Sequence, residues 1–178
     1  IRQNNHKGGS IEVDFVKKNS SLNKESVALL DYFISEEEAM ISKKDIFYSS
    51  INNRISKNLT KIKNKLNLLN RDEWEILGFG ASHSTTTLLH MLNSDHNLID
   101  YILDDNKIKQ GRYSPGYNLQ VLDPLNLSNI RYKKSKRLIV CLAWQHSESI
   151  LKRHFGNLSE TLWIIPFPEL RIIYPNIK

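Results

Sequence analysis

The sequence is a basic chain of 178 residues with a formal net charge of +6, and 40% of its residues are hydrophobic. No run approaches the roughly eighteen apolar residues of a membrane span, and residues 1–5 do not resemble a signal peptide, so no membrane partner is expected. The single cysteine, Cys141, excludes an internal disulfide and favours a cytoplasmic location. Because the chain does not begin with methionine, we expect it to be a piece of a longer protein or a processed form.

The positive charge suggests nucleic acid as a partner, since the sequence pI is about 9.3. Lysines and arginines are spread over residues 57–65 and 131–137 without interleaved aromatic platforms, and no helix-turn-helix, zinc-finger or RNA-recognition signature accompanies them. Attraction to a phosphorylated small molecule explains the charge equally well. We therefore expect no nucleic-acid partner. The sequence also has no cysteine pair and no H-x-x-x-H spacing, so we expect no metal site.

The N-terminal part is expected to contain one strand and two helices. Residues 11–16 alternate apolar and polar side chains as in a half-buried strand, whose sheet partner would lie far away in the sequence or outside this chain. Residues 21–35 and 44–69 predict two amphipathic helices, the second with lysines on a solvated face. We interpret residues 1–70 as a strand with connecting helices that leads into a domain of residues 71–178.

The C-terminal domain opens with a strand, a glycine turn and a helix. Residues 75–78 predict a short buried strand, which the turn at residues 78–81 ends. Ser82 or Ser84 can cap the following helix, in which apolar residues recur at helical spacing up to residue 92. Residues 98–103 predict a second buried strand, closed by two acidic residues.

This order of elements is typical of a Rossmann-type unit that binds a nucleotide. In such a unit, free backbone N–H groups at the helix start face phosphate, and the acid after the second strand, here Asp104, accepts hydrogen bonds from ribose hydroxyls. Gly78 and Gly80 supply only part of the glycine fingerprint, because a Ser-His-Ser run stands where the third glycine would be expected. A tight turn that merely packs the strand on the helix is the structural alternative.

The segment after the second strand, residues 104–116, is polar and contains glycine and proline, which predicts a loop. Its Lys109, Arg112 and Tyr113 suit a phosphate and a ring. An ordinary connecting loop would need none of these side chains. We therefore predict that this loop contacts a ligand or a partner.

The remaining elements complete a parallel sheet. Strands are predicted at residues 119–122, 138–144 and 161–165, with a helix at residues 148–155. Open parallel sheets bind ligands beyond the carboxyl ends of their strands, which places Trp144 and His146 on the same rim as the glycine turn. Helix capping or packing is the alternative role for His146. The predicted fold class is α/β, a Rossmann-like doubly wound parallel sheet preceded by an N-terminal strand and helical segment.

Several segments together resemble one family. They are the G-F-G-A-S turn at residues 78–82, the strand that runs from Ile99 to Asp104, the run K-Q-G-R-Y-S-P-G at residues 109–116, L-A-W at residues 142–144, and I-P-F-P-E at residues 165–169. The K-Q-G-R-Y-x-P-G run is the most specific of them. Over about residues 74–169 the chain resembles the C-terminal domain of the sugar C-methyltransferases, which use S-adenosylmethionine to methylate a carbon of a nucleotide-linked keto-deoxysugar.

The resemblance implies a division of roles between two domains. In the family the C-terminal domain helps to hold the sugar nucleotide, while the cofactor and the catalytic base belong to a preceding methyltransferase domain, for which this chain has no room. The fragment alone is therefore expected to bind a nucleotide-linked deoxysugar, to hold no cofactor and not to methylate. Ser84 and Thr85 stand where the family usually has a lysine and a glycine, and His83 replaces the missing cation only in part.

Two hypotheses stay open at this point. In the first, the chain is the substrate-binding domain of a methyltransferase, whose turn approaches phosphate while the basic loop closes over the ligand. In the second, it is a non-catalytic interaction module whose degenerate turn packs against a neighbouring domain. An NAD-dependent enzyme is disfavoured by the missing third glycine. The residues predicted to contact substrate are Gly78, Gly80, Ala81, Ser82, His83, Asp104, Lys109, Arg112, Tyr113, Trp144 and His146.

Overall fold

The computed structural model describes residues 1–4, 9–17, 20, 24–92, 98–125, 134, 136–156 and 160–174. The chain forms two compact units, Ile1–Arg54 and Ile55–Lys178, and the boundary between them falls within helix α2 (Lys44–Asn67). The sequence pattern alone suggests a boundary near residue 70. The end of α2 belongs to the second unit because Ile62 and Leu66 are buried in its core. Within the described ranges, no helix combines the length and apolar character that crossing a membrane requires.

The first unit begins with a short antiparallel hairpin. Strand β1 (Arg2–Asn4) pairs with β2 (Ser10–Glu12), and the Arg2 guanidinium forms an ion pair with the Glu12 carboxylate at 3.0 Å. The prediction of a half-buried strand with a distant partner is wrong. Its partner precedes it closely in the sequence, and the Ile11 side chain is 54% exposed.

Helix α1 (Lys24–Ser42) confirms the first predicted helix, although its predicted start at residues 21–23 lies outside the described residues. None of the residues of α1 is buried. Val27, Leu30 and Ile34, which define its apolar stripe, are all exposed. In the described part of the first unit, this apolar stripe therefore does not pack against a hydrophobic core.

The second unit is built on a six-stranded sheet with the order β5-β4-β3-β6-β7-β8. All neighbouring strands are parallel except β8, which runs antiparallel to β7. Because β3 lies in the middle and later strands extend outward on both sides, this is the strand order of a doubly wound sheet. The predicted α/β class is confirmed. The strands are β3 (Trp74–Phe79), β4 (Tyr101–Leu103), β5 (Val121–Leu122), β6 (Lys136–Cys141), β7 (Thr161–Ile165) and β8 (Arg171–Ile173).

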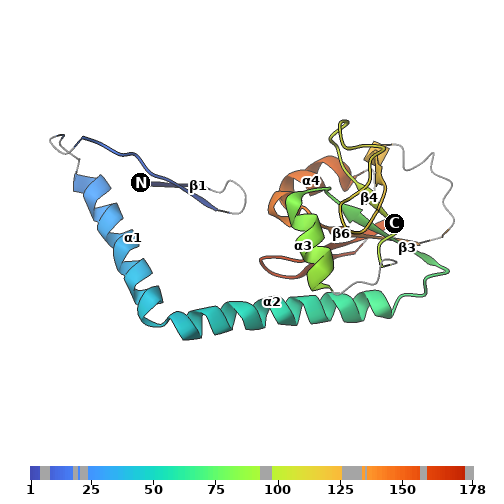
Figure 1. The fold of residues 1–178 in the computed structure, drawn as a ribbon, viewed down its shortest axis with the longest axis horizontal. Helices are drawn as coiled ribbons and strands as arrows, with labels where there is room; N and C mark the ends of the chain where they lie inside the picture. The colour runs from blue at the N-terminus through green and yellow to red at the C-terminus, as the bar shows by residue number, and fades with distance from the viewer. Residues whose placement is uncertain are drawn as a thin grey trace. The chain divides into compact units, whose positions relative to one another are not determined.

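Helices cover both faces of this sheet. Helix α3 (His83–Met91) and the end of α2 pack on one face, where Leu88 and Ile62 join the same buried cluster. Helix α4 (Ser147–His154) packs on the other face through Ile150. Figure 1 shows α3 and α4 against strands β3, β4 and β6. The two layers leave the carboxyl ends of the strands as a rim, along which the predicted site residues lie.

The opposite rim, at the amino ends of the strands, carries ion pairs. Two of them, formed by Lys136 and Arg137, neutralise part of the basic segment at residues 131–137, of which residues 134, 136 and 137 are described. The charge there therefore serves contacts within the fold. The pairs are Arg71–Asp100 at 2.8 Å, Lys136–Glu73 at 2.6 Å and Arg137–Glu75 at 3.3 Å.

Candidate functional site

The glycines of the turn are explained by close packing against the end of β6. A Cβ atom at Gly78 would lie 2.3 Å from the Leu142 Cδ1 atom, and one at Gly80 would lie 2.3 Å from the Ala143 Cβ atom. Gly80 also has a φ of +100°, which side chains rarely tolerate. The glycines thus bring two neighbouring strand ends together. This supports the structural alternative for the turn, although the packing partner is the end of β6 rather than the helix.

The backbone N–H groups of the turn are already hydrogen-bonded within the protein. Gly80 N donates to Leu103 O at 2.7 Å, Ala81 N to the Asp104 Oδ2 atom at 2.7 Å, and Ser82 N to the Thr85 Oγ1 atom at 3.0 Å. The prediction that these groups are free to face phosphate is wrong for all three. A ligand at this turn must therefore be bound mainly by side chains.

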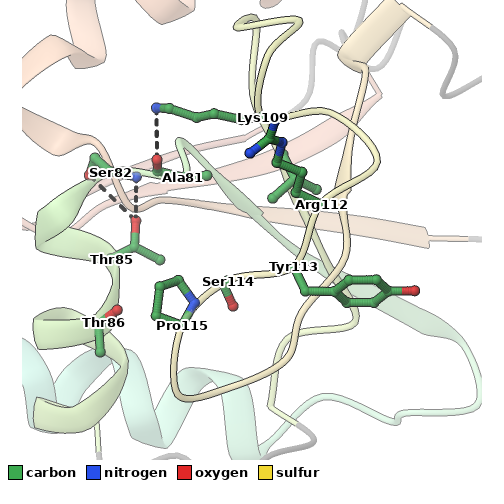
Figure 2. Close-up of a pocket in the computed structure, with 10 residues that line it drawn as sticks. Ala81, Ser82, Thr85, Thr86, Lys109, Arg112, Tyr113, Ser114 and Pro115 are labelled. Carbon is green, nitrogen blue, oxygen red and sulfur yellow. Dashed lines mark hydrogen bonds between the residues drawn. The ribbon is translucent and has the colours of Figure 1, made fainter.

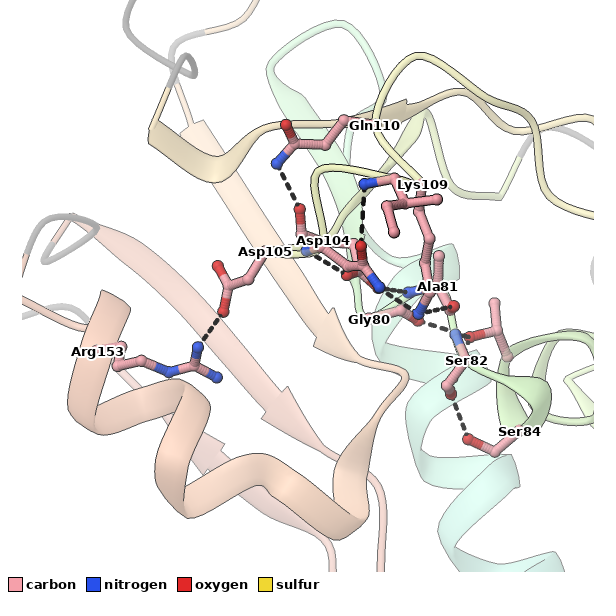
Figure 3. A network of polar contacts seen from close by, with 12 residues as sticks. Gly80, Ala81, Ser82, Ser84, Asp104, Asp105, Lys109, Gln110 and Arg153 are labelled. Carbon is pink, nitrogen blue, oxygen red and sulfur yellow. Dashed lines mark hydrogen bonds and ion pairs between the residues drawn. The ribbon is translucent and has the colours of Figure 1, made fainter.

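Asp104 directs its carboxylate into the protein. Its Oδ1 atom accepts a hydrogen bond from Asn106 N at 2.8 Å, and its Oδ2 atom lies 3.2 Å from the Lys109 Nζ atom in addition to Ala81 N. Its residue surface is only 8% exposed. Figure 3 shows this network, in which Asp104 lies between the turn and Lys109. Both carboxylate oxygens therefore already have partners within the protein, and the ribose contact stays a prediction.

The predicted loop, which we call the flap (residues 104–116), lies over the turn. Lys109 Nζ donates to Ala81 O at 2.8 Å, and Gln110 Nε2 donates to Asp104 O at 2.9 Å. The flap also pairs with β5, because Gly111 N donates to Val121 O at 2.8 Å. The sequence therefore correctly indicates that turn and flap face each other.

A pocket of about 150 Å³ lies between the flap and the start of α3 (Figure 2). Five of the predicted residues, Ala81, Ser82, Lys109, Arg112 and Tyr113, line this pocket. The other residues that line the pocket were not predicted from the sequence. Hydroxyl groups beside a basic K-Q-G-R-Y run would have been the signal for some of them. The missed residues are Thr85, Thr86, Ser114, Pro115 and Val121.

Arg112 supplies the pocket with a cation that has no described partner. Within the described ranges, no hydrogen bond or ion pair engages its guanidinium group. Figure 2 shows this group pointing toward Ala81, whereas the ring of Tyr113 points away from Ser82 and Thr85. Tyr113 is 58% exposed. Among the described residues, the arrangement offers an anion the guanidinium group of Arg112, with hydroxyl groups on the opposite wall of the pocket.

The other predicted residues line the rim outside this pocket. Trp144 packs its ring against Phe167 with centroids 5.6 Å apart, which gives it a packing role. His146 is exposed at the start of α4, and His83 is exposed in the first turn of α3. Their contact with substrate stays a prediction. Ser84, next to His83, donates its hydroxyl to Leu142 O at 3.2 Å and so joins α3 to the end of β6.

Acidic, histidine and cysteine side chains do not gather into a metal site in the part of the chain that the structure describes. Cys141 lies at the end of β6 and is completely buried. Burial raises the pKa of its thiol from 9.0 to about 12, so the group is neutral and unreactive at ordinary pH.

Comparison with known proteins identifies the family. Residues 5–168 match the family described as the C-methyltransferase C-terminal domain, which covers most of the chain. A comparison with curated proteins gave no match. The match extends from β2 to β7, and it includes both the turn and the flap. The chain therefore belongs to the C-methyltransferase C-terminal domain family, as the sequence resemblance indicated.

Proposed function

We propose that the pocket under the flap binds the phosphate-bearing part of a nucleotide-linked keto-deoxysugar. The observation that carries this proposal is the Arg112 guanidinium group, which faces the pocket without a partner in the described ranges. A guanidinium group binds phosphate oxygens through paired hydrogen bonds. Thr86 and Ser114 line the same pocket and carry hydroxyl groups that can add further hydrogen bonds.

The size of the pocket limits which part of the substrate it holds. A cavity of about 150 Å³ holds roughly one six-membered ring in other proteins, whereas a whole sugar nucleotide is several times larger. The pocket therefore takes one phosphate group or one ring. The rest of the substrate, including the carbon that receives the methyl group, extends toward a methyltransferase domain that precedes this one in the full-length protein.

S-adenosylmethionine belongs to that preceding domain in this proposal. The residues of this turn do not fit the cofactor, because Asp104 holds the Ala81 amide and Ala143 fills the space beside Gly80. We therefore assign no step of methyl transfer to this chain. Its own part is to hold the non-reacting end of the substrate, so that binding energy there orients the reacting end.

The alternative is an interaction module that binds no sugar nucleotide. One observation favours it: the backbone amides of Gly80, Ala81 and Ser82 are all hydrogen-bonded inside the protein. On this view, the turn packs strand ends together and the flap faces a neighbouring domain. The alternative differs from the proposal in predicting that no nucleotide stabilises the chain.

A thermal-shift experiment separates the two functions. The chain is melted with dTDP, UDP, GDP, NAD and S-adenosylmethionine, each at the same concentration. The proposal expects a nucleoside diphosphate to raise the Tm, because a ligand that binds only the folded state stabilises it. NAD and S-adenosylmethionine are expected to leave it unchanged. A panel without any shift would contradict the proposal and favour the interaction module.

A further inference from the structure

One carboxylate and one ammonium group join the flap to the turn. The Asp104 Oδ2 atom accepts from Ala81 N at 2.7 Å and lies 3.2 Å from the Lys109 Nζ atom. Lys109 Nζ also donates to Ala81 O at 2.8 Å. Ala81 is therefore held through both its N–H and its C=O group. Two side chains of the flap make these contacts, and they close a small ring of hydrogen bonds (Figure 3).

The two charges of this pair neutralise each other. The Asp104 side chain is 11% exposed and the Lys109 side chain 41% exposed, so the carboxylate is the more buried partner. A buried carboxylate that lost its cation would leave an uncompensated charge, which is unfavourable. Lys109 is thus committed to Asp104 and Ala81. In the pocket it lines, Arg112 is the cation left to meet a ligand.

The position of Arg112 depends on the same segment. Arg112 N donates to Lys109 O at 3.1 Å, which makes one turn of the backbone between the two residues. Val121 N then donates to Arg112 O at 2.8 Å and fixes the end of this turn to β5. Lys109 anchors the start of the turn to Ala81, and Val121 anchors its end. The guanidinium group is therefore carried by a backbone that is held at two points.

We propose that Asp104 and Lys109 are positioning residues, which clamp the flap to the turn and so hold Arg112 at the pocket. Neither residue contacts the ligand. This inference rests on the proposed function for its effect on binding, but the clamp itself concerns the protein alone. It changes the predicted roles of both residues, because both carboxylate oxygens of Asp104 and two of the three ammonium N–H donors of Lys109 already have partners within the protein.

A rival explanation makes the opposite prediction. Asp104 occupies the donors that a phosphate would use at this turn, namely one backbone N–H group and one lysine. If Asp104 were an internal substitute for the ligand, removal of its charge would free these donors. Asp104→Asn would then tighten the binding of an anion. If Asp104 is part of a clamp, the same variant loosens the flap and weakens binding.

The first measurement is dTDP affinity of the full chain by calorimetry. We expect Asp104→Asn and Lys109→Met each to weaken dTDP binding about fivefold to twentyfold. The double variant should bind dTDP no more weakly than the single variant with the lower affinity, because each substitution already breaks the same clamp. Lys109→Arg should restore most of the affinity. Lys107→Met, on the same flap but outside the pocket, should leave it unchanged. Tighter binding by Asp104→Asn would overturn the proposal.

The second measurement is amide hydrogen exchange in the flap without ligand. Exchange at Gly111 and Val121 should accelerate at least tenfold in Asp104→Asn and Lys109→Met, but not in Arg112→Ala or Lys107→Met. Unchanged exchange in the clamp variants would overturn the proposal even if their dTDP affinity falls, since direct ligand contact would then explain the loss. If the unaltered chain binds no dTDP, the proposed function fails, while the exchange rates still decide whether the clamp exists.

Discussion

The two sides of the glycine turn are built for different purposes. Toward β6, Gly80 lies so close to Ala143 that a methyl group does not fit, and Ser84 closes the gap to Leu142. Toward β4, the flap leaves a pocket that contains the guanidinium group of Arg112, which pairs with none of the described residues. A doubly wound sheet usually binds ligands where its strand order reverses, which here is between β3 and β6. In this protein that position is closed, and the pocket lies beside it.

The largest effect is expected for a methyl group added at Gly80, on the side of the turn that faces β6, which we call the closed side. Gly80→Ala should lower the free energy of unfolding by about 4 kcal/mol, from backbone strain at a φ of +100° and from overlap with Ala143. Gly111→Ala is the matched control, because Gly111 also has a positive φ, +77°, but no atom near a Cβ. It should cost only about 1–2 kcal/mol. Urea unfolding measures both, and equal losses would show that the close approach is unimportant.

On the open side of the turn, which carries the pocket, a substitution should change ligand affinity and leave the stability of the fold unchanged. Arg112→Ala is expected to weaken dTDP binding roughly thirtyfold, or about 2 kcal/mol, as for loss of a hydrogen bond to a charged group. The Tm without ligand should stay the same, because no described residue pairs with this side chain. Arg112→Lys keeps the charge but cannot form the paired hydrogen bonds. Its dTDP affinity should lie between those of the unaltered chain and Arg112→Ala. Unchanged affinity in Arg112→Ala would remove the residue from the site.

The pH dependence of the free energy of unfolding tests how completely Cys141, at the end of β6, is buried. Burial raises the pKa of its thiol from 9.0 to about 12, so the folded state keeps the thiol neutral while the unfolded state ionises it above pH 9. Its contribution to stability is complete below pH 9 and is lost as the pH rises toward 12. At pH 10 the loss is about 1.4 kcal/mol. Cys141→Ala should lack this part of the alkaline slope, and identical slopes would contradict the burial argument.

The sequence predicts the central elements well because they are continuous apolar runs. Strand β7 has the predicted bounds, since all five of its residues are buried and no other element fits such a run. Strand β8 was missed because three residues at an antiparallel edge carry no periodicity. The hairpin partner of β2 was missed for the same reason, since β1 is also only three residues long.

The sequence indicates some of the residues that line the pocket, and the roles that it predicts wrongly have a common cause. The sequence predicts that Lys109 and Arg112 lie in one ligand-contacting loop; both line the pocket, and their contact with a ligand stays a prediction. Which of the two cations is already neutralised depends on the position of Asp104 in space. The role of Gly80 likewise depends on Ala143, which is distant in the sequence. Local patterns indicate which residues meet at a rim, whereas their partners are set by tertiary packing.

The smallest effect is expected at Ser84, in the first turn of α3. Its hydroxyl donates to Leu142 O at 3.2 Å and lies 2.7 Å from the Ser82 Oγ atom. Ser84→Ala should therefore cost about 1 kcal/mol of stability, the net value of one hydrogen bond, and leave dTDP affinity unchanged.

Ser149→Ala is the control, because Ser149 Oγ donates to His146 O at an exposed position and should matter less. If Ser84→Ala weakened dTDP binding instead, Ser84 would belong to the ligand site. The closed side of the turn would then take part in binding, and the division between the two sides would fail. If only stability falls, the Ser84 hydroxyl belongs to the packing between α3 and the end of β6.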